Sequence, residues 1–384
     1  MTAHGPADSD ISLYETRKAA WSMMSYLARL NYSFDDRYTI TGTFRADGSS
    51  RFGVNNRWGY FPSVSAGWTL SNEPFLKDAF ENIVSIRIRA SWGKSGNNDI
   101  RNYSSFETYG KLDSLGRCTT AYANIGLDLG FFNSRLNVIA NYYNSISTDI
   151  LYNAPISAIS GFTSSTTNMT DAKLRNRGFD LQVDARLLTG KVKWNVSTNI
   201  SVNRNKVVSL GGLDDVLSTS ERSVQSHITK EGHPVGSFYG YKAVGIMSEI
   251  DYKNALKDRQ VYLANGSKFP AGYTLQGPAV PSYALDDLSY GNTIWQDVNR
   301  DGVIDTNDKT ILGNAYPDFT GGFSTSLSWN GFDLGASFTY SYGGEVINFQ
   351  DYYLFNVEGS SNQYAIAADR YVSDTDPGRN NVPI

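Results

Sequence analysis

Residues 297–308 carry oxygen-bearing side chains at the spacing of a calcium-binding loop. The segment reads Asp-Val-Asn-Arg-Asp-Gly-Val-Ile-Asp-Thr-Asn-Asp, with glycine at position 6 for the sharp turn and an apolar residue at position 8. Asp308 stands at position 12, where the pattern has glutamate, so the backbone would have to come closer to an ion. The predicted ligands of a Ca²⁺ ion are Asp297, Asn299, Asp301, Val303, Asp305 and Asp308.

The same segment also suits a structural turn that needs no ion. Asp and Asn side chains bond to nearby backbone groups in turns, and Gly adopts conformations that other residues avoid. Both interpretations fit residues 297–308. Calcium is therefore a candidate cofactor, and the sequence indicates no other.

Catalytic motifs are missing from the rest of the chain. His227 and His233 lie in a long polar segment, but no G-x-S-x-G, H-E-x-x-H or phosphate-binding glycine loop accompanies them. Paired acids such as Asp214-Asp215 read as solvated loop charges. We expect a protein that is not an enzyme.

Apolar and polar side chains alternate through most of the chain. In residues 179–187 the odd positions are apolar and the even positions are polar or charged, and after a turn at Thr189-Gly190 the alternation resumes. Successive side chains of a strand point to opposite faces, so each segment has one apolar and one polar face. The segments are near the ~9–11 residues that cross a bilayer at a tilt. They predict an all-β protein, a transmembrane antiparallel β-barrel that is present in part.

Similar alternation gives roughly eleven strands, joined by short turns on one side and long extracellular loops on the other, as in outer-membrane barrels. An Asn330-Gly331 turn is the strongest short hairpin signal. The main runs are 26–34, 38–46, 64–70, 86–92, 125–131, 136–142, 192–202, 323–329 and 332–340. The charged side chains expected to face the lumen are Arg29, Arg45, Arg87, Arg89, Asp180, Asp184 and Arg186.

A soluble β-sandwich alternates as well, so a soluble carbohydrate-binding β-domain with structural calcium is the alternative. Long strands with Arg and Asp at mid-strand favour the membrane barrel. Two stretches, 154–175 and 206–317, lack the alternation of apolar and polar residues and are predicted to be extracellular loops. The expected organisation is an irregular lead-in at 1–24, barrel strands and loops at 25–205, a long extracellular loop region with the calcium-type motif at 206–317, a transmembrane hairpin at 318–342 and a truncated extracellular loop at 343–384.

Composition narrows the class of protein further. No run of about eighteen apolar residues exists, which argues against membrane-spanning helices. The mean hydropathy of −0.36 suits a barrel with a polar lumen and polar loops. A net charge of −4 argues against a nucleic-acid partner. The single Cys118 cannot form an internal disulfide.

Several segments, in order along the chain, resemble the SusC/RagA family of TonB-dependent outer-membrane receptors. One of them, 56–68, reads Asn-Arg-Trp-Gly-Tyr-Phe-Pro-Ser-Val-Ser-Ala-Gly-Trp, and another, 311–323, reads Ile-Leu-Gly-Asn-Ala-Tyr-Pro-Asp-Phe-Thr-Gly-Gly-Phe. The full set is 45–53, 56–68, 89–93, 124–132, 176–179, 234–241, 297–308 and 311–323. The resemblance covers nearly the whole chain from about residue 25.

This resemblance implies a barrel in the cell outer membrane that imports oligosaccharides, or in some members peptides. A SusD-like surface lipoprotein would close the extracellular mouth, and the TonB system would supply energy through an N-terminal plug. The chain departs from the family pattern because a signal peptide, the plug and a final aromatic-ended strand are not seen in it. We therefore expect a fragment of the barrel. The substrate, the partner lipoprotein and the oligomeric state do not follow from the sequence.

Overall fold

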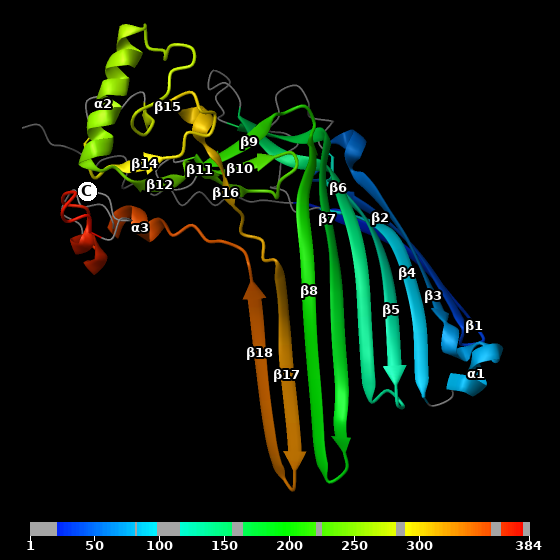
Figure 1. The fold of residues 1–384 in the computed structure, drawn as a ribbon. Helices are drawn as coiled ribbons and strands as arrows, with labels where there is room; N and C mark the ends of the chain where they lie inside the picture. The colour runs from blue at the N-terminus through cyan, green and yellow to red at the C-terminus, as the bar shows by residue number, and fades with distance from the viewer. Residues whose placement is uncertain are drawn as a thin grey trace, which may run out of the picture. The chain divides into compact units, whose positions relative to one another are not determined.

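The computed structural model describes residues 21–80, 83–97, 116–155, 164–219, 225–281, 289–354 and 362–378. Among these residues, no helix is long and apolar enough to cross a membrane. The chain divides into two compact units, which are residues 1–198 with 325–336 (unit 1) and residues 199–324 with 337–384 (unit 2). Figure 1 shows the elements along the chain.

A ten-stranded sheet has the order β1-β2-β3-β4-β5-β6-β7-β8-β17-β18. Strands β1 to β7 pair antiparallel with their sequence neighbours, which is the meander expected from the alternation. The strands are β1 (Met23–Phe34), β2 (Tyr38–Ser49), β3 (Trp58–Thr69), β4 (Val84–Gly96), β5 (Thr119–Phe131), β6 (Leu136–Pro155), β7 (Ser164–Thr189), β8 (Val192–Leu210), β17 (Phe319–Trp329) and β18 (Phe332–Tyr342).

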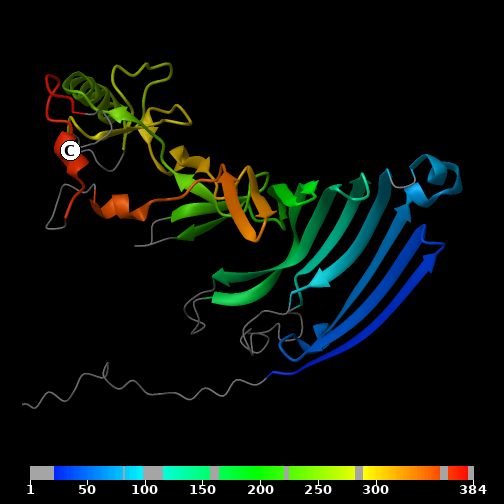
Figure 2. The same cartoon turned by 90° about the horizontal axis from the view of Figure 1, so that it is seen from below.

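In unit 1, β1 to β7 lie side by side as one curved layer (Figures 1 and 2). One end of this layer, the turn end, carries tight connections such as Asp35-Asp36, whose positive φ angles of 50° and 48° suit Asp in a turn. The opposite end, the loop end, carries the longer connections, including the 3-10 helix η2 (Val54–Asn56).

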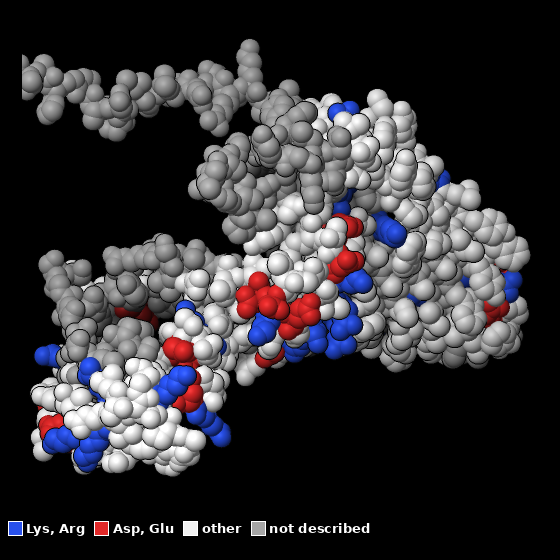
Figure 3. Space-filling view, turned by 90° about the horizontal axis from the view of Figure 1, so that it is seen from above, with Lys and Arg blue, Asp and Glu red and all other residues white. Residues whose placement is uncertain are grey.

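The two faces of the unit 1 layer differ in chemistry, as the alternation predicts. The apolar face stays open to the outside: Ile40 is 51% exposed, Val64 47% and Ile125 62%. In Figure 3, where white marks all residues other than Lys, Arg, Asp and Glu, the surface on the right carries only isolated charged side chains. A sandwich would cover such a face with a second sheet, whereas a barrel wall turns it toward lipid. The polar face carries Ser, Thr, Asn, Arg and Asp side chains.

Glu73 fixes the turn end of β1 to β3. It lies in the connection between the 3-10 helix η3 (Leu70–Asn72) and the helix α1 (Pro74–Phe80), and it is buried. Its carboxylate accepts hydrogen bonds from Tyr38 Oη, from Trp68 Nε1 at 2.9 Å and from Arg37 Nη1 at 3.0 Å. The hydrogen bond from Tyr38, followed by that from Trp68, holds the pKa of Glu73 below its usual value.

Unit 2 contains a four-stranded sheet of order β16-β11-β10-β9. Its strands are β9 (Asp215–Thr219), β10 (Gln225–Lys230), β11 (Ser237–Gly240) and β16 (Thr310–Gly313). Smaller pairs join β12 (Ala243–Ile246) to β14 (Thr293–Trp295) and β13 (Val280–Pro281) to β15 (Val303–Ile304). The remaining helices are α2 (Glu249–Ala264), α3 (Phe349–Leu354) and the 3-10 helices η6 (Thr306–Asp308) and η7 (Ala365–Asp369).

Helix α2 begins at a double cap. Ser248 and Asp251 form a reciprocal capping box, and Asp374 accepts a hydrogen bond from the Glu249 amide at 3.0 Å. Tyr371 donates to the same Asp374 carboxylate, and burial together with this bond raises the pKa of Tyr371 to about 12. The residues around 371–374 are thereby tied to the start of the helix.

One prediction about loops is wrong, and a second omits ordered elements. Residues 154–175 are predicted as a loop, but β6 continues to Pro155 and β7 begins at Ser164. Residues 206–317 are predicted as a long loop region mostly without strand periodicity; they lie between β8 and β17 of the ten-stranded sheet and hold the end of β8, helix α2 and the four-stranded sheet. Strand segments that are polar on both faces carry no apolar alternation to reveal them. The hairpin expected at 318–342 is present as β17 and β18.

Candidate functional site

The polar face of unit 1 brings hydrophilic side chains together across its strands. Residues directly opposite each other in neighbouring strands share a face, so the pairing defines rows. The first row contains Asn31, Thr41, Ser65, Ser91, Asn124 and Tyr143. The second row contains Ser33, Thr39, Gly67, Arg89, Gly126, Asn141 and Asp180.

Arg89 is the centre of the strongest polar contacts on this face. Its Nε and Nη2 atoms donate to the two carboxylate oxygens of Asp128 at 2.7 and 2.6 Å, and Nη2 also donates to Asn141 Oδ1 at 3.1 Å. Arg87 donates to Thr39 Oγ1 at 3.3 Å. The bidentate pair fixes the plane of the Arg89 guanidinium against the sheet.

Two glycines provide the space that the Arg87 and Arg89 side chains occupy. A Cβ at Gly126 would lie 2.7 Å from Asn141 Oδ1 and 2.9 Å from Arg89 Nη2. A Cβ at Gly67 would lie 2.6 Å from Thr39 Oγ1 and 3.1 Å from an Arg87 nitrogen. Glycine in a strand interior often marks such a close approach. The two glycines therefore let the guanidinium groups lie across the strands.

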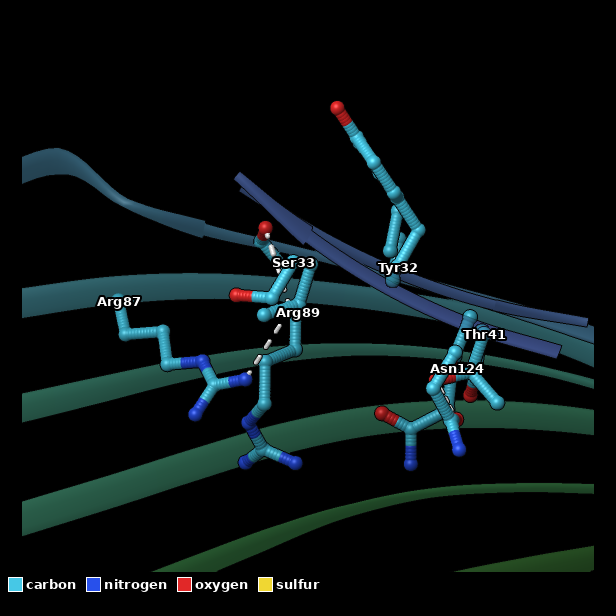
Figure 4. A pocket seen from close by; sticks show the side chains of 13 residues that line it. Tyr32, Ser33, Thr41, Arg87, Arg89 and Asn124 are labelled. Carbon is cyan, nitrogen blue, oxygen red and sulfur yellow. Dashed lines mark hydrogen bonds between the residues drawn. The ribbon is translucent and has the colours of Figure 1, made fainter. Parts of the chain in front are cut away.

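A hollow of about 500 Å³ opens between these rows. Figure 4 shows Thr41, Arg87, Arg89 and Asn124 projecting to one side of the sheet and Tyr32 to the other. Hydroxyl, carboxamide and guanidinium groups dominate the polar lining, so the hollow can donate to and accept from a hydroxylated or amide-bearing solute. Its lining also includes Asn31, Ser33, Thr39, Ser65, Gly67 and Ser91.

The charged side chains predicted to share one face do occupy the polar face, spread from β1 to β7: Arg29, Arg45, Arg87, Arg89, Asp180, Asp184 and Arg186. Several have partners in place. Arg45 Nε donates to the buried Asp47 at 2.9 Å, and Arg186 Nη2 donates to the Ser134 carbonyl at 2.6 Å. Sequence reasoning did not single out Asp128 or Asn141 as partners of Arg89. Because Asp128 alternates with Leu127 and Leu129, the same two-residue rule could have found it.

The segment 297–308 lies in unit 2 and folds as a tight loop. Asp297 accepts backbone N–H bonds from Arg300 at 2.6 Å and Gly302 at 2.8 Å. Gly302 has a φ angle of 88°, which fits the glycine expected at position 6, and Arg300 at position 4 also has a positive φ of 60°. Asp301 accepts from the Val303 amide at 2.9 Å.

Asp308 closes this loop from inside. It is fully buried, and its carboxylate oxygens accept from the Val298 and Asp305 amides at 2.8 Å each. Asp305 in turn caps η6 through Asn307. These are the side-chain-to-backbone bonds of the structural interpretation, although each carboxylate oxygen keeps further acceptor capacity.

Among the residues that the structure describes, no three His, Cys, Asp or Glu side chains are placed to hold a metal ion. A Ca²⁺ ion at 297–308 would need the side chains of Asp297, Asn299, Asp301 and Asp305 to converge. Calcium binding by this loop stays a prediction.

The loop tyrosines Tyr239, Tyr241, Tyr283 and Tyr290 are candidates for stacking on sugar rings, and two of them are engaged with other aromatic side chains. Tyr241 packs against Trp295 with a ring-centroid distance of 5.9 Å, and Tyr290 meets Tyr252 edge-on at 6.2 Å. Tyr283 lies outside the described residues. These contacts agree with the packing of aromatic side chains within unit 2.

A comparison with protein families matches residues 4–296 to the family described as TonB dependent receptor-like, beta-barrel. The chain belongs to the TonB-dependent receptor β-barrel family. Its strands therefore form part of an antiparallel barrel wall in the cell outer membrane, as the resemblance of the sequence motifs implies. This membership also accounts for the apolar face that remains open in unit 1, and the alternative of a soluble β-domain loses its support.

Individual relatives of this receptor chain support the family assignment. TonB-dependent receptor P39 of Formosa agariphila is 34% identical over 96% of the chain and 37% of its own length. TonB-dependent receptor SusC of Bacteroides thetaiotaomicron is 29% identical over 84% of the chain and 31% of its own length. The solved structure of the RagAB peptide transporter matches with a TM-score of 0.74 at 26% identity, covering 95% of the chain and 38% of that structure's chain. The receptor chain thus spans about a third of the length of the curated relatives it matches.

Proposed function

We propose that this chain forms part of the wall of a transporter that imports a polar oligomer, an oligosaccharide in first place, across the outer membrane. The observation that carries the proposal is the polar face of unit 1, where Arg89, Asp128 and Asn141 form a fixed network beside a hollow of about 500 Å³. Hydroxyl and carboxamide groups around this network can exchange hydrogen bonds with sugar hydroxyls while a solute moves past.

The orientation of the sheet supports this role. The apolar face suits contact with lipid, which leaves the polar face for the water-filled interior. A chain with hydrophilic groups along successive strands offers many similar contacts, and repeated moderate contacts suit passage better than one tight site. The resemblance to SusC/RagA receptors implies the same class of solute.

The partners in this proposal are a SusD-like surface lipoprotein and the TonB system. The lipoprotein would deliver the solute at the loop end, and TonB would supply energy to the whole receptor. Both rest on the family resemblance and on the similarity to SusC.

Peptide import is the second candidate function. It is favoured by the match to the RagAB peptide transporter over 95% of the chain. Arg87, which donates to the neutral Thr39 hydroxyl, could pair with a peptide carboxylate as readily as it meets sugar hydroxyls. The choice between the two classes depends on the solute that the complete receptor carries.

Uptake by cells tests the proposal directly. A strain lacking the whole gene that encodes this chain, and the same strain carrying a restored copy, would receive labelled oligosaccharides and labelled peptides. Loss of uptake of one class, with recovery on restoration, supports import and identifies the class. Unchanged uptake of every oligosaccharide and peptide offered would contradict the proposal. Purification of the receptor from outer membranes would reveal whether a surface lipoprotein accompanies it.

A further inference from the structure

Four cations stand at the loop end of the apolar face of unit 1. Lys94 of β4 and Lys173, Arg175 and Arg177 of β7 alternate in phase with the apolar side chains of their strands. Lys94, Lys173 and Arg177 are exposed and Arg175 is half-buried. Within the described ranges, none of the four forms an ion pair or a side-chain hydrogen bond. We call them the outer basic cluster.

The pairing of the strands places this cluster at a defined level along β4 to β7. Lys94, Ala121, Ile146 and Arg175 lie opposite one another on β4 to β7. The row Val84, Phe131, Leu136 and Ala185 lies ten residues closer to the turn end along each strand. Between the two rows, the side chains on this face are apolar or aromatic except Asn144 and Arg177.

The distance between these two rows matches the thickness of the apolar part of a membrane. Ten residues at about 3.3 Å each give about 33 Å along a strand, which is about 25 Å along the membrane normal at a tilt of about 40°. The apolar band of an outer-membrane barrel is also about 25 Å tall. Arg175 and Lys94 therefore reach the level of the lipid headgroups, and the long Arg177 side chain can extend to it. On β1 to β3 the same face ends in the aromatic stack of Tyr26 and Trp58, as expected at an interface.

The cluster has the chemistry of a phosphate-binding site. Lys173, Arg175 and Arg177 follow one another at about 7 Å along β7, and Lys94 lies about 14 Å away across three strand spacings. Guanidinium groups bind phosphate oxygens in a bidentate manner, and each cation at an anionic surface strengthens binding. Asp149 and Asp171 lie where the β6–β7 register shifts beyond Lys173, and neither pairs with the cluster.

We propose that the outer basic cluster binds the phosphorylated headgroup of a lipid in the outer leaflet of the outer membrane. A solute inside the barrel would meet the polar face, so this site is separate from the hollow near Arg89. The proposal rests on the outer-membrane location of the family and does not depend on which solute is imported.

Lipid binding by the complete receptor, purified in detergent, tests the proposal. The probe is bisphosphorylated lipid A, compared with the same lipid after removal of its phosphates and with inorganic phosphate alone. The double variant Arg175→Gln/Arg177→Gln should weaken lipid A binding about thirtyfold, since two cations at about 1 kcal/mol each give about 2 kcal/mol. The matched control Lys77→Gln/Lys191→Gln removes two exposed cations at the turn end and should leave binding unchanged.

Each remaining outcome decides for or against the site. Equal binding of lipid A by the wild type and the Arg175/Arg177 variant would overturn the proposal, as would equal binding of the dephosphorylated lipid. Inorganic phosphate that binds as tightly as lipid A would show an anion site without lipid selectivity and would also overturn it. If the double variant fails to fold, Lys94→Gln on a different strand should weaken lipid A binding about fivefold. Unchanged binding by a folded Lys94→Gln receptor would then reject the cluster.

Discussion

The Arg89 guanidinium meets the Asp128 carboxylate through two hydrogen bonds of 2.7 and 2.6 Å on the polar face of unit 1. The two residues come from adjacent strands, and their side chains are 38% and 30% exposed. Water screens a pair with this exposure, so its contribution to stability is modest. Its geometric effect is larger, because it fixes a cation that would otherwise be free to bind anions.

Replacing Asp128 with Asn should therefore affect anion binding by Arg89 more than it affects the stability of the sheet. The change keeps the size of the side chain but removes the charge that neutralises Arg89. We expect a loss of at most about 1 kcal/mol in the free energy of unfolding. Urea titration in detergent, followed by the heat-dependent gel mobility typical of folded barrels, measures this loss. A loss of several kcal/mol would show that the pair acts as a structural element of the sheet.

Gly126→Ala should disturb the same network sterically. The new Cβ would lie 2.9 Å from Arg89 Nη2 and 2.7 Å from Asn141 Oδ1, so these flexible ends must move and their mutual hydrogen bond breaks. One lost hydrogen bond costs about 1 kcal/mol. Gly42→Ala is the matched control, because nothing lies within 4 Å of its added Cβ. We expect this control to be neutral or slightly stabilising in the same urea titration. Equal destabilisation by both variants would mean that crowding at Arg89 is not the cause.

Glu73 makes the stability of the turn end depend on pH. Its folded pKa is lowered, first by the Tyr38 hydrogen bond, so the ionised form is the one that the folded state prefers. The stabilisation is present above the unfolded pKa of about 4.3 and is lost as the pH falls through the lower folded pKa. Glu73→Gln should therefore lower the melting temperature at pH 7, and the difference from the wild type should shrink below about pH 4.

Asp35→Asn provides the control for this pH dependence. Asp35 also contacts Arg37, at 2.7 Å, but its side chain is 65% exposed, whereas that of Glu73 is 7% exposed. Asn tolerates the positive φ of this position. The melting temperature of Asp35→Asn should stay close to that of the wild type at every pH. A constant gap between wild type and Glu73→Gln from pH 3 to pH 7 would argue that ionisation of Glu73 plays no part.

The sequence allowed prediction of the fold where one face of a strand is apolar. The hairpin at Asn330-Gly331 and the meander of β1 to β7 follow from two-residue alternation and turn residues, because lipid on one side and water on the other impose that pattern. The outer part of β7 was missed because the residues on both of its faces are mostly polar there.

Helix α2 was missed for a related reason. Only Ala255 and Asp258 are buried in it, so it has no apolar stripe of helical period. Its capping box, Ser248 with Asp251, was the available signal. At the candidate site, alternation placed Arg89 on the correct face. Its pairing with Asp128 depends on the register between β4 and β5, which the alternation within a single strand does not fix.

The loop at 297–308 allows the structural and the calcium interpretations to be separated by two variants. Asp308→Ala removes a fully buried carboxylate that holds the Val298 and Asp305 amides, so two backbone donors lose their partner. This variant should be cleaved faster within the loop by a protease, both with calcium and with a chelator. Asp301→Asn keeps an oxygen for the Val303 amide but removes a charge that an ion would need.

If the loop binds Ca²⁺, the ion should protect the wild-type loop from proteolysis, and Asp301→Asn should lose that protection while its cleavage in chelator stays at the wild-type rate. The expected order of cleavage in calcium is then Asp308→Ala fastest, Asp301→Asn intermediate and wild type slowest. Identical digestion of the wild type with calcium and with chelator would reject the ion and leave the hydrogen bonds of Asp297, Asp305 and Asp308 as the whole explanation of the motif. The Asp308→Ala result tests those hydrogen bonds in either case, because its two lost backbone contacts do not involve an ion.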